Sequence, residues 1–436
     1  LGVSSYLKKH AWENTVLEDF VNAQALQSGK ELSGWSKEWL YQAGVNKVKV
    51  QFNCQMGKIS EFKVLQSAPE THPILRSQRT QLALLNIIEG KVATYHVTPI
   101  TISGAVTEVK AVEGLECPYL AYPNYQGWGY AEVELDQISK DNAFDALAKL
   151  NDPLLRSMLW TSILDDSDTD LTRVIDAIKT ESNDRIINQV QNSLINKFNT
   201  LERQNYQGLE SIVSQFEKLL WQLLNASTTH KNIKIISFNS FVTAVRSNQG
   251  IQHLIGLLEN KNTLAELPIN QEYRWMVIKR LAELGRPDVQ QLIHNEKLKD
   301  PSDAGVLATI AAEAALPDMA TKKKWLAVFM NNENPMPLSN QRQAMTSIFP
   351  ANQVALQAEL LPELLSALPM IKDTRDNYYQ RSYGGDLLNG ICTKASLKQM
   401  ELILDKEKIG TTLYRFVSEN VQKAQKCVEG IAALNP

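Results

Sequence analysis

The clearest pattern near the start of the chain is an alternation of apolar and polar residues between about Asn46 and Tyr130. Five short runs show it, and turn residues such as Met56-Gly57 and Glu89-Gly90 separate them. The runs are KVKVQFN, KISEFKVLQ, RTQLALLNI, VATYHVTPITISG and VTEVKAV. Several short strands within one such stretch predict a small β-sandwich over residues 46–130.

From Asp136 to the C-terminus the spacing of apolar residues becomes helical. In DPLLRSMLWTSILDD, the residues Leu155, Leu159 and Ile163 fall on one helix face. Further helix-stop-helix units follow in QEYRWMVIKRLAELGRPD, DAGVLATIAAEAALPD, TKKKWLAVFM and SNQRQAMTSIF. Paired antiparallel helices of this kind stack in HEAT- or armadillo-like arrays. Because no fixed-length repeat is present, we expect a large irregular α-helical domain over residues 131–436.

Helices are also predicted ahead of the strand region. The first ends at Gly29, and the second has Ser33 as its N-cap with Trp35 and Trp39 one turn apart on one face. The period then changes abruptly to strand-like alternation. We interpret residues 1–45 as the last helices of a preceding domain that is mostly missing from this chain. The expected fold class is therefore mainly α, with a small β-sandwich between these helices and the large helical domain.

Composition narrows the possible functions. The chain has 436 residues, of which 44% are hydrophobic and 21% charged, as in folded proteins with ordinary cores. Its net charge of −3 lacks the basic field of a nucleic-acid binder, so no nucleic-acid partner is expected. No apolar run reaches the roughly 18 to 20 residues that cross a bilayer, so no membrane partner is expected either.

The four cysteines, Cys54, Cys117, Cys392 and Cys427, lie far apart and form no CxxC pair. This spacing argues against a structural zinc site and against a dense disulfide framework. A reducing cytoplasm suits such usage and is the expected location. An exported protein with few disulfides is the alternative that the cysteines leave open.

Several segments, in order, resemble the aminopeptidase N family of zinc metallopeptidases, the gluzincins that include the puromycin-sensitive and endoplasmic-reticulum aminopeptidases. YLKKHAWENTVLEDF and SGKELSGWSKEWLYQAGVN resemble the end of its catalytic domain, and ILRSQRTQLALL resembles the Arg-containing strand of its β-sandwich. CPYLAYPNYQGWGYAEVELD is similar to its transition into the helical domain. NDPLLRSMLWTSILDD and YRWMVIKRLAELGR resemble two helices of that last domain, in the bacterial subgroup.

The resemblance implies three parts. Residues 1–45 correspond to the C-terminal helices of a truncated metallopeptidase catalytic domain, residues 46–130 to the β-sandwich, and residues 131–436 to the helical C-terminal domain. Such enzymes hold zinc with a His-Glu-x-x-His motif and a later Glu, and the Glu inside the motif is the general base.

The zinc motif is not found in this sequence. None of the six histidines is followed by Glu, and no two are four residues apart. The family's Gly-x-Met-Glu-Asn segment, which recognises the substrate amine, is absent too. We therefore expect no catalytic, cofactor-binding or metal-binding residue in this chain. Zinc is expected only in the parent enzyme, and the residues of its substrate chamber remain unknown.

The function implied by the resemblance is that of a non-catalytic region. It would enclose the substrate chamber of a zinc aminopeptidase that removes N-terminal amino acids from peptides, and it would be inactive alone. Its partners would be peptide substrates and its own missing catalytic domain. The alternative is a stand-alone helical-repeat scaffold that binds proteins along a concave surface and has no enzymatic activity.

Two clusters of polar residues have competing interpretations. Arg381 lies in sequence among Tyr378, Tyr379 and Tyr383, which could face a substrate chamber, although solvated surface is the simpler interpretation. The basic run 322–324 is expected to form the exposed face of a helix whose other side carries apolar residues.

Overall fold

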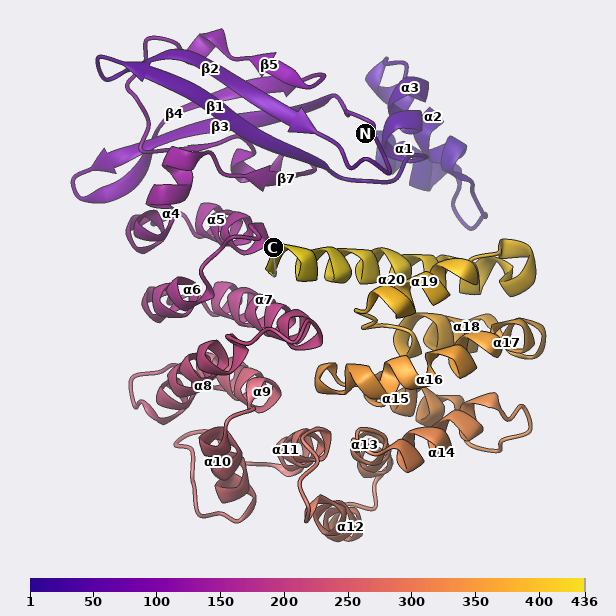
Figure 1. Cartoon of the computed structure of the whole chain (residues 1–436). Coiled ribbons are helices and arrows are strands. Elements are labelled where there is room, and N and C mark those ends of the chain that lie inside the picture. The colour runs from indigo at the N-terminus through magenta and orange to yellow at the C-terminus, as the bar shows by residue number, and fades with distance from the viewer. Residues whose placement is uncertain (435–436) are drawn as a thin grey trace. The chain divides into compact units, whose positions relative to one another are not determined.

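The computed structural model of the chain describes residues 1–434. It divides into two compact units, of which the first comprises residues 1–181 and the second begins at Ser182. A small β region stands in the first unit, and helices make up most of the rest (Figure 1). The predicted mainly α fold class is confirmed.

Seven strands form two sheets in the first unit. One sheet has the order β5-β2-β1-β7 and the other the order β4-β3-β6. Figure 1 shows the sheets as two layers. The strands are β1 (Asn46–Gln55), β2 (Lys58–Ser67), β3 (Gln78–Ile88), β4 (Lys91–Ile102), β5 (Val106–Glu108), β6 (Leu120–Tyr122) and β7 (Ala131–Glu134). The five predicted runs correspond to β1–β5, whereas the short β6 and β7 were not expected.

The alternation of apolar residues places one face of each long strand in a core between the sheets. Val50 pairs with Val64 and Phe52 with Phe62 across the antiparallel β1–β2 ladder. The two phenylalanine rings stack at 5.4 Å between centroids. All four side chains are buried or nearly so, which matches the period of two that predicted these strands.

Helices flank the sandwich within the first unit. The predicted stop at Gly29 is confirmed, since this glycine ends α2 with a left-handed φ of 66°. Ser33 is the first helical residue of α3, and Leu32 takes the N-cap position expected for Ser33. The helices of this unit are α1 (Gly2–Lys9), α2 (Leu17–Ser28), α3 (Ser33–Trp39), α4 (Gln137–Lys149), α5 (Pro153–Asp165) and α6 (Leu171–Ala177), with 3-10 turns η1 (Lys110–Val112), η2 (Tyr125–Gly127) and η3 (Ile178–Thr180).

Helices are the only regular secondary structure among the described residues of the second unit. Its earlier helices are α7 (Asp184–Arg203), α8 (Leu209–Asn225), α9 (Lys231–Ala244), α10 (Asn248–Leu258), α11 (Gln271–Glu283), α12 (Val289–Lys299) and α13 (Asp303–Ala314). The later ones are α14 (Met319–Met330), α15 (Leu338–Ser347), the 3-10 turn η4 (Ala351–Gln353), α16 (Val354–Ser366), α17 (Leu368–Thr374), α18 (Asn377–Ser382), the π-helical turn η5 (Tyr383–Leu387), α19 (Lys394–Leu402) and α20 (Lys406–Leu434).

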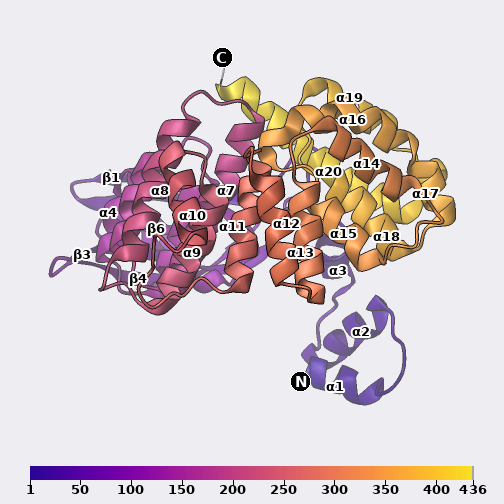
Figure 2. The ribbon, with the colours of Figure 1, turned by 90° about the horizontal axis from the view of Figure 1, so that it is seen from below.

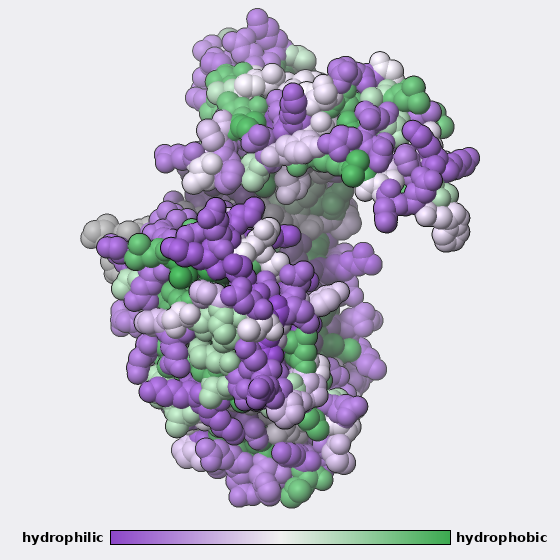
Figure 3. All heavy atoms as spheres, turned by 90° about the vertical axis from the view of Figure 1, so that its right-hand side faces the viewer, coloured by the Kyte–Doolittle hydropathy of each residue, from purple (hydrophilic) through white to green (hydrophobic). Residues whose placement is uncertain are grey.

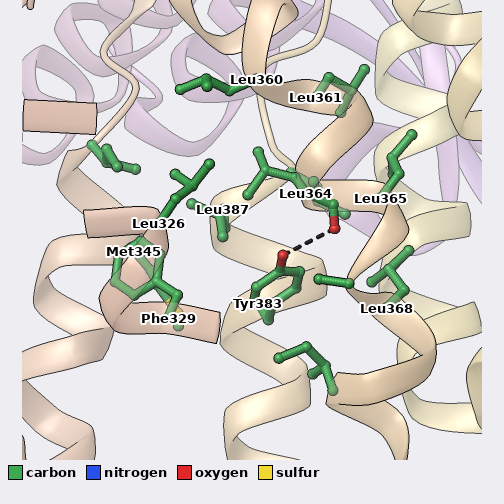
Figure 4. Packing of buried hydrophobic residues seen from close by; sticks show 14 of the residues in the cluster. Leu326, Phe329, Met345, Leu360, Leu361, Leu364, Leu365, Leu368, Tyr383 and Leu387 are labelled. Carbon is green, nitrogen blue, oxygen red and sulfur yellow. Dashed lines mark hydrogen bonds between the residues drawn. The ribbon is translucent and has the colours of Figure 1, made fainter. Parts of the chain in front are cut away.

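A large apolar core joins the later helices of this unit. Figure 4 shows leucines of α16 packed around Tyr383, Leu326 and Phe329. The Tyr383 hydroxyl donates a hydrogen bond to the carbonyl oxygen of Leu364 at 2.9 Å, so this fully buried phenol is satisfied. Tyr383 therefore belongs to the core, and of the neighbouring tyrosines only Tyr378 is exposed.

The expectation that the basic run 322–324 forms an exposed helix face is wrong for Lys322. Its side chain is fully buried, and its ammonium donates to the carbonyl oxygen of Ala314 at 2.8 Å, at the last turn of α13. Burial lowers the pKa of this lysine to about 7. Lys323 and Lys324 are exposed as expected. The sequence pattern missed Lys322 because its partner carbonyl comes from the neighbouring helix.

Among the described residues, no single helix is both long and apolar enough to cross a membrane. The bent pair 351–366 and 368–374 passes that test only when the two helices are taken together, and its leucines are buried in the core. Figure 3 shows the side of the second unit on which α17 lies in Figure 1. Hydrophilic residues cover most of this side, with hydrophobic residues in small patches.

The ends of the second unit meet. The Gln204 carboxamide, just after α7, donates to the carbonyl oxygen of Cys427 in α20 at 2.9 Å. Cys427 also forms a disulfide with Cys392, on the loop before α19. A second disulfide, Cys54–Cys117, lies in the first unit. All four cysteines are thus paired.

Candidate functional site: the grooves of the inner helix layer

Five helices of the second unit form one continuous layer. In the series α7, α9, α11, α13 and α15, each helix packs on the next. The helices between them, α8, α10 and α12, pack mainly on the helices that adjoin them in sequence. Figure 2 shows α11, α13 and α15 in a row. In a stacked helical array the more closely spaced layer is the one on the inside of the curve. We call these five helices the inner layer.

Two grooves lie on this layer. The first, between α7 and α9, has a volume of about 410 Å³. The second, between α11 and α13 with Gln343 of α15 at its edge, has a volume of about 670 Å³. We name them the α7–α9 groove and the α11–α13 groove. They differ in chemistry, because the first is lined by uncharged polar side chains with two isoleucines, and the second has an apolar floor.

The α7–α9 groove follows from the amphipathic pattern of α7. Val190, Leu194 and Phe198 are fully or nearly fully buried on one face of this helix. The asparagines 188, 192 and 196 recur every four residues on a different, exposed face. Inside the layer, the buried Gln191 carboxamide donates to the Ser237 hydroxyl of α9 at 3.3 Å and ties the two helices together. The groove is lined by Asn188, Asn192, Ile195, Asn196, Ile236, Asn239, Ser240 and Thr243.

The carboxamides of this groove are only lightly engaged by the protein. Asn192 donates to the side-chain oxygen of Asn188 at 3.2 Å. Within the described part of the chain, the side chains of Asn196 and Asn239 have no hydrogen-bond partner in the protein, and both residues are exposed. Each carboxamide keeps both donor and acceptor capacity for a bound molecule. Among residues 1–434, no charged side chain lines the groove.

An ion-pair cluster lies at the C-terminal ends of α7 and α9. Arg246, just after α9, contacts both carboxylate oxygens of Glu202 at 3.1 and 2.6 Å. The same guanidinium donates to the side-chain oxygen of Asn199, and the backbone amide of Arg246 donates to buried Glu217 of α8. These contacts fix the end of α7 against the next helix pair. Asn199 is therefore occupied, unlike Asn196.

The α11–α13 groove has Trp275 at its base. The indole N–H donates to the Oδ2 of Asp300 at 2.8 Å, and hydrogen bonds from the Ser302 hydroxyl and from this indole hold the pKa of Asp300 below its usual value. Met276 and Leu307 add apolar walls, while Glu272 and Lys279 stand at the rim. This groove can accept an apolar group, and its charged side chains are Glu272, Lys279 and the Asp300 carboxylate that accepts the indole hydrogen bond.

A salt bridge holds α11 in place behind that groove. Arg274 contacts both oxygens of buried Glu296 in α12, at 2.7 and 2.8 Å. Hydrogen bonding from Arg274, opposed by burial and aided by Gln271, lowers the pKa of Glu296 to about 2. Glu296 is thus a charged anchor of the layer at neutral pH.

In the first unit, Arg76 holds the N-terminal helices against the sandwich. This arginine is 4% exposed, its guanidinium lies 5.5 Å from the centroid of the Trp39 ring, and its backbone amide donates to Asn46. Its guanidinium donates to backbone carbonyls at the end of α3 and in the segment that follows this helix. The acceptors are Glu38, Gln42, Ala43 and Gly44, at 2.7 to 3.0 Å.

A cavity of about 780 Å³ lies beside β1 and β7 in the first unit. Its three lysines are each paired, with Lys47 near Glu132, Lys49 bonded to Glu134 at 2.6 Å and Lys140 bonded to Asp166 at 2.5 Å. Exposed pairs of this kind are ordinary solvated surface. We therefore regard the inner layer of the second unit as the better candidate.

The residues singled out in the sequence do not gather into a reactive site. His253 stacks on Trp221, and His230 caps α9. Arg381 packs near the Phe416 ring of α20 instead of forming a shared cluster with the buried Tyr379 and Tyr383. Within residues 1–434, no three His, Cys, Asp or Glu side chains are placed to hold a metal ion. The described residues therefore do not fit a zinc site, and no chemical step is assigned to zinc here.

Comparison with known proteins identifies the family. The model of the ERAP1-like C-terminal domain matches residues 120–426. The chain belongs to this family. It is also similar to aminopeptidase N of Streptomyces lividans, with 24% identity over 449 residues that cover 99% of this chain and 52% of that enzyme. The chain thus spans about half the length of this relative. The resemblance to aminopeptidase N-type enzymes is confirmed.

The grooves of the inner layer are what the sequence alone did not reveal. The spacing of Asn188, Asn192 and Asn196 was visible, but a groove-facing asparagine and a solvent-facing one have the same periodicity. Trp275 likewise looked like an ordinary apolar position of its helix. Only the packing of α7 on α9 and of α11 on α13 distinguishes these faces.

Proposed function

We propose that this chain is the non-catalytic C-terminal region of a zinc aminopeptidase that removes N-terminal amino acids from peptides. The observation that carries the proposal is the family match over residues 120–426, together with similarity to about half of an aminopeptidase N. Zinc and the catalytic residues would be supplied by the other half. Peptide substrates and that catalytic half are the proposed partners.

The proposed role of the region is to enclose the substrate chamber and limit access to it. Residues 1–45 would complete the catalytic domain, residues 46–130 would act as a spacer, and residues 131–436 would cover the chamber. An enclosed shape excludes folded proteins and admits flexible peptides. The buried anchors of the inner layer, such as Glu296, suit a wall that keeps its shape.

The test compares the 436-residue chain with the longer protein that contains it. The chain alone should release no amino acid from a linear peptide and should bind no stoichiometric zinc. The longer protein should contain one zinc and should cleave the linear peptide, but not the same sequence at the start of a tightly folded domain. Hydrolysis by the chain alone would refute the proposal. A longer protein with neither zinc nor activity would favour the stand-alone scaffold.

The pairing of the cysteines supports a proposal for the compartment. A reducing cytoplasm was the expected location, but both Cys54–Cys117 and Cys392–Cys427 are disulfides in the structure. Disulfides persist mainly in oxidising compartments. We therefore propose the exported alternative for this protein, and a thiol count on protein isolated from its source cells under alkylating conditions tests it.

A further inference from the structure

We propose that the α7–α9 groove binds the main chain of an extended peptide, without regard to its side chains. The inference rests on the proposed function, because it assigns a part of the wall to the peptide substrate. It depends on the chemistry of the lining, on the spacing of the asparagines and on how few hydrogen bonds their side chains make within the protein.

The lining selects for a neutral ligand with both hydrogen-bond donors and acceptors. Each carboxamide offers an N–H and a carbonyl oxygen, which is the same combination that a peptide unit presents. None of the described residues that line the groove is charged, so a phosphate or carboxylate would find no counter-charge there. No aromatic ring lines it either, so a nucleobase would have nothing to stack on. The main chain of a peptide matches this lining best.

The spacing of the asparagines matches an extended chain. Asn188, Asn192 and Asn196 follow one another every four residues along α7, which is about 6 Å per step at 1.5 Å per residue. In an extended peptide, groups on one edge repeat every two residues, or about 6.7 Å. The three carboxamides can therefore meet successive peptide units of one strand over about 12 Å, or roughly four residues. Asn239 faces the same groove from α9.

The hydrogen bonds that the asparagine side chains make within the protein agree with this role. Asn199, one turn further along, is held by Arg246 at 3.0 Å, whereas Asn196 and Asn239 keep free carboxamides among the described residues. The contact between Asn192 and Asn188, at 3.2 Å, joins two groove residues to each other and uses one donor of Asn192 and the oxygen of Asn188. The groove thus offers a stretch of side-chain carboxamides with free donors and acceptors.

Recognition of the main chain suits a substrate whose sequence changes at every turnover. An enzyme that shortens a peptide one residue at a time presents a new side chain in each position after each cycle. Side-chain pockets would then favour some registers over others, while contacts to peptide units are the same in all of them. The α11–α13 groove, with its apolar floor, lacks this property and is not part of the proposal.

The test uses the 436-residue chain and an octapeptide of alanine, serine and glutamine with both termini blocked, in a titration followed by NMR of the peptide. A scrambled octapeptide should bind equally well. An octapeptide N-methylated at alternate residues should bind at least tenfold more weakly, because it has lost its backbone donors on one edge. The triple variant Asn192→Ala, Asn196→Ala and Asn239→Ala should lose about tenfold in affinity.

The matched control is Asn295→Ala, an exposed asparagine on α12, outside the inner layer, that accepts a hydrogen bond from Gln291. It should bind like the wild type. Alanine is the best helix former, so these substitutions leave the helices intact. Equal binding by the triple variant, equal binding of the methylated peptide, or no binding by the wild type at millimolar peptide would each overturn the proposal.

These outcomes are separable from those for the proposed function. If the longer protein is an active zinc aminopeptidase and the groove binds no peptide, only the groove assignment fails. If the groove binds peptide and the longer protein has neither zinc nor activity, only the proposed function fails.

Discussion

The guanidinium of Arg76 lies 5.5 Å from the centroid of the Trp39 ring and binds the carbonyls of the segment that follows this tryptophan. Trp39 ends α3, and Arg76 precedes β3, so the contact joins two elements that are distant in sequence. The planar fork of arginine can serve several carbonyls at once, which a lysine ammonium cannot do in the same geometry. The exit from α3 is thereby fixed by one side chain.

Arg76→Lys should loosen this exit. Hydrogen bonds to a charged group contribute about 1.5 to 3 kcal/mol each, so loss of two of them would destabilise the segment by about 3 kcal/mol. We expect hydrogen exchange in residues 33–45 to accelerate by about 100-fold, while the strands β1 and β2 keep their protection. Arg79→Lys, at an exposed position on β3, is the control and should change nothing. Unchanged exchange in residues 33–45 of the Arg76 variant would show that other contacts hold the joint.

Lys322 should make stability depend on pH. Its folded pKa of about 7 lies below the usual 10.5, so the folded state resists protonation of this amine. Between pH 7 and 10.5 the unfolded chain binds a proton that the folded chain lacks, and stability from this group therefore rises with pH across that window. Below pH 7 both states are protonated, and the full cost of burying the charge remains.

Lys322→Met should remove that cost and flatten the dependence. Urea unfolding at pH 6, 7.5 and 9 should show the wild type gaining about 2 kcal/mol relative to the variant as pH rises to 9. The exposed Lys324→Met is the control and should run parallel to the wild type. Parallel curves for Lys322→Met and wild type would show that Lys322 titrates near its usual pKa.

Strand β1 and Lys322 show how much of the fold can be predicted from the sequence. The alternation around Val50 and Phe52 identified the buried faces of β1, because burial of one sheet face is a local, periodic property. The burial of Lys322 depends on the carbonyl of Ala314 and on the Phe349 ring, 5.9 Å from its ammonium. Such partners come from other elements, and the periodicity of a single helix does not contain them.

The candidate site was harder to predict from the sequence than the fold was. The motif comparison correctly pointed to the aminopeptidase N family, yet no residue of the inner layer was identified from it. The spacing of Asn192 and Asn196 did not distinguish them from ordinary surface positions, and β6 and β7 were too short to produce a pattern. Whether a helix face is exposed to solvent or lines a groove depends on the helices that pack beside it.

Glu296→Gln should weaken the inner layer and alter its response to acid. Removing one partner of a buried pair costs about 3 kcal/mol at neutral pH, because Arg274 would lose its counter-charge. The folded pKa of Glu296 is lowered from 4.5 to about 2, so its stabilisation is present above pH 4.5 and is lost as the pH falls toward 2. Denaturation between pH 7 and 3 should show a smaller loss for the variant than for the wild type. The exposed Glu272→Gln on α11 is the control. An unchanged unfolding midpoint at pH 7 would contradict the structural role of the pair.

The disulfide Cys392–Cys427 should fasten α20 to the rest of the second unit. It closes a loop of 35 residues, and the chain-entropy relation gives about 4 kcal/mol for a loop of this length. The double variant Cys392→Ala and Cys427→Ala should therefore unfold at lower urea concentration and expose α20 to protease first. A reducing agent should destabilise the wild type, while its effect on the variant should be limited to Cys54–Cys117. Four reactive thiols in the unreduced native protein would contradict the pairing.

The most direct test of the central claim is the intact mass and bound zinc of the native protein, captured from its source cells with an antibody against this chain. A protein much larger than 49.0 kDa that carries one zinc per molecule is the predicted result. A metal-free protein near 49.0 kDa would contradict the assignment to a zinc aminopeptidase and would favour the scaffold.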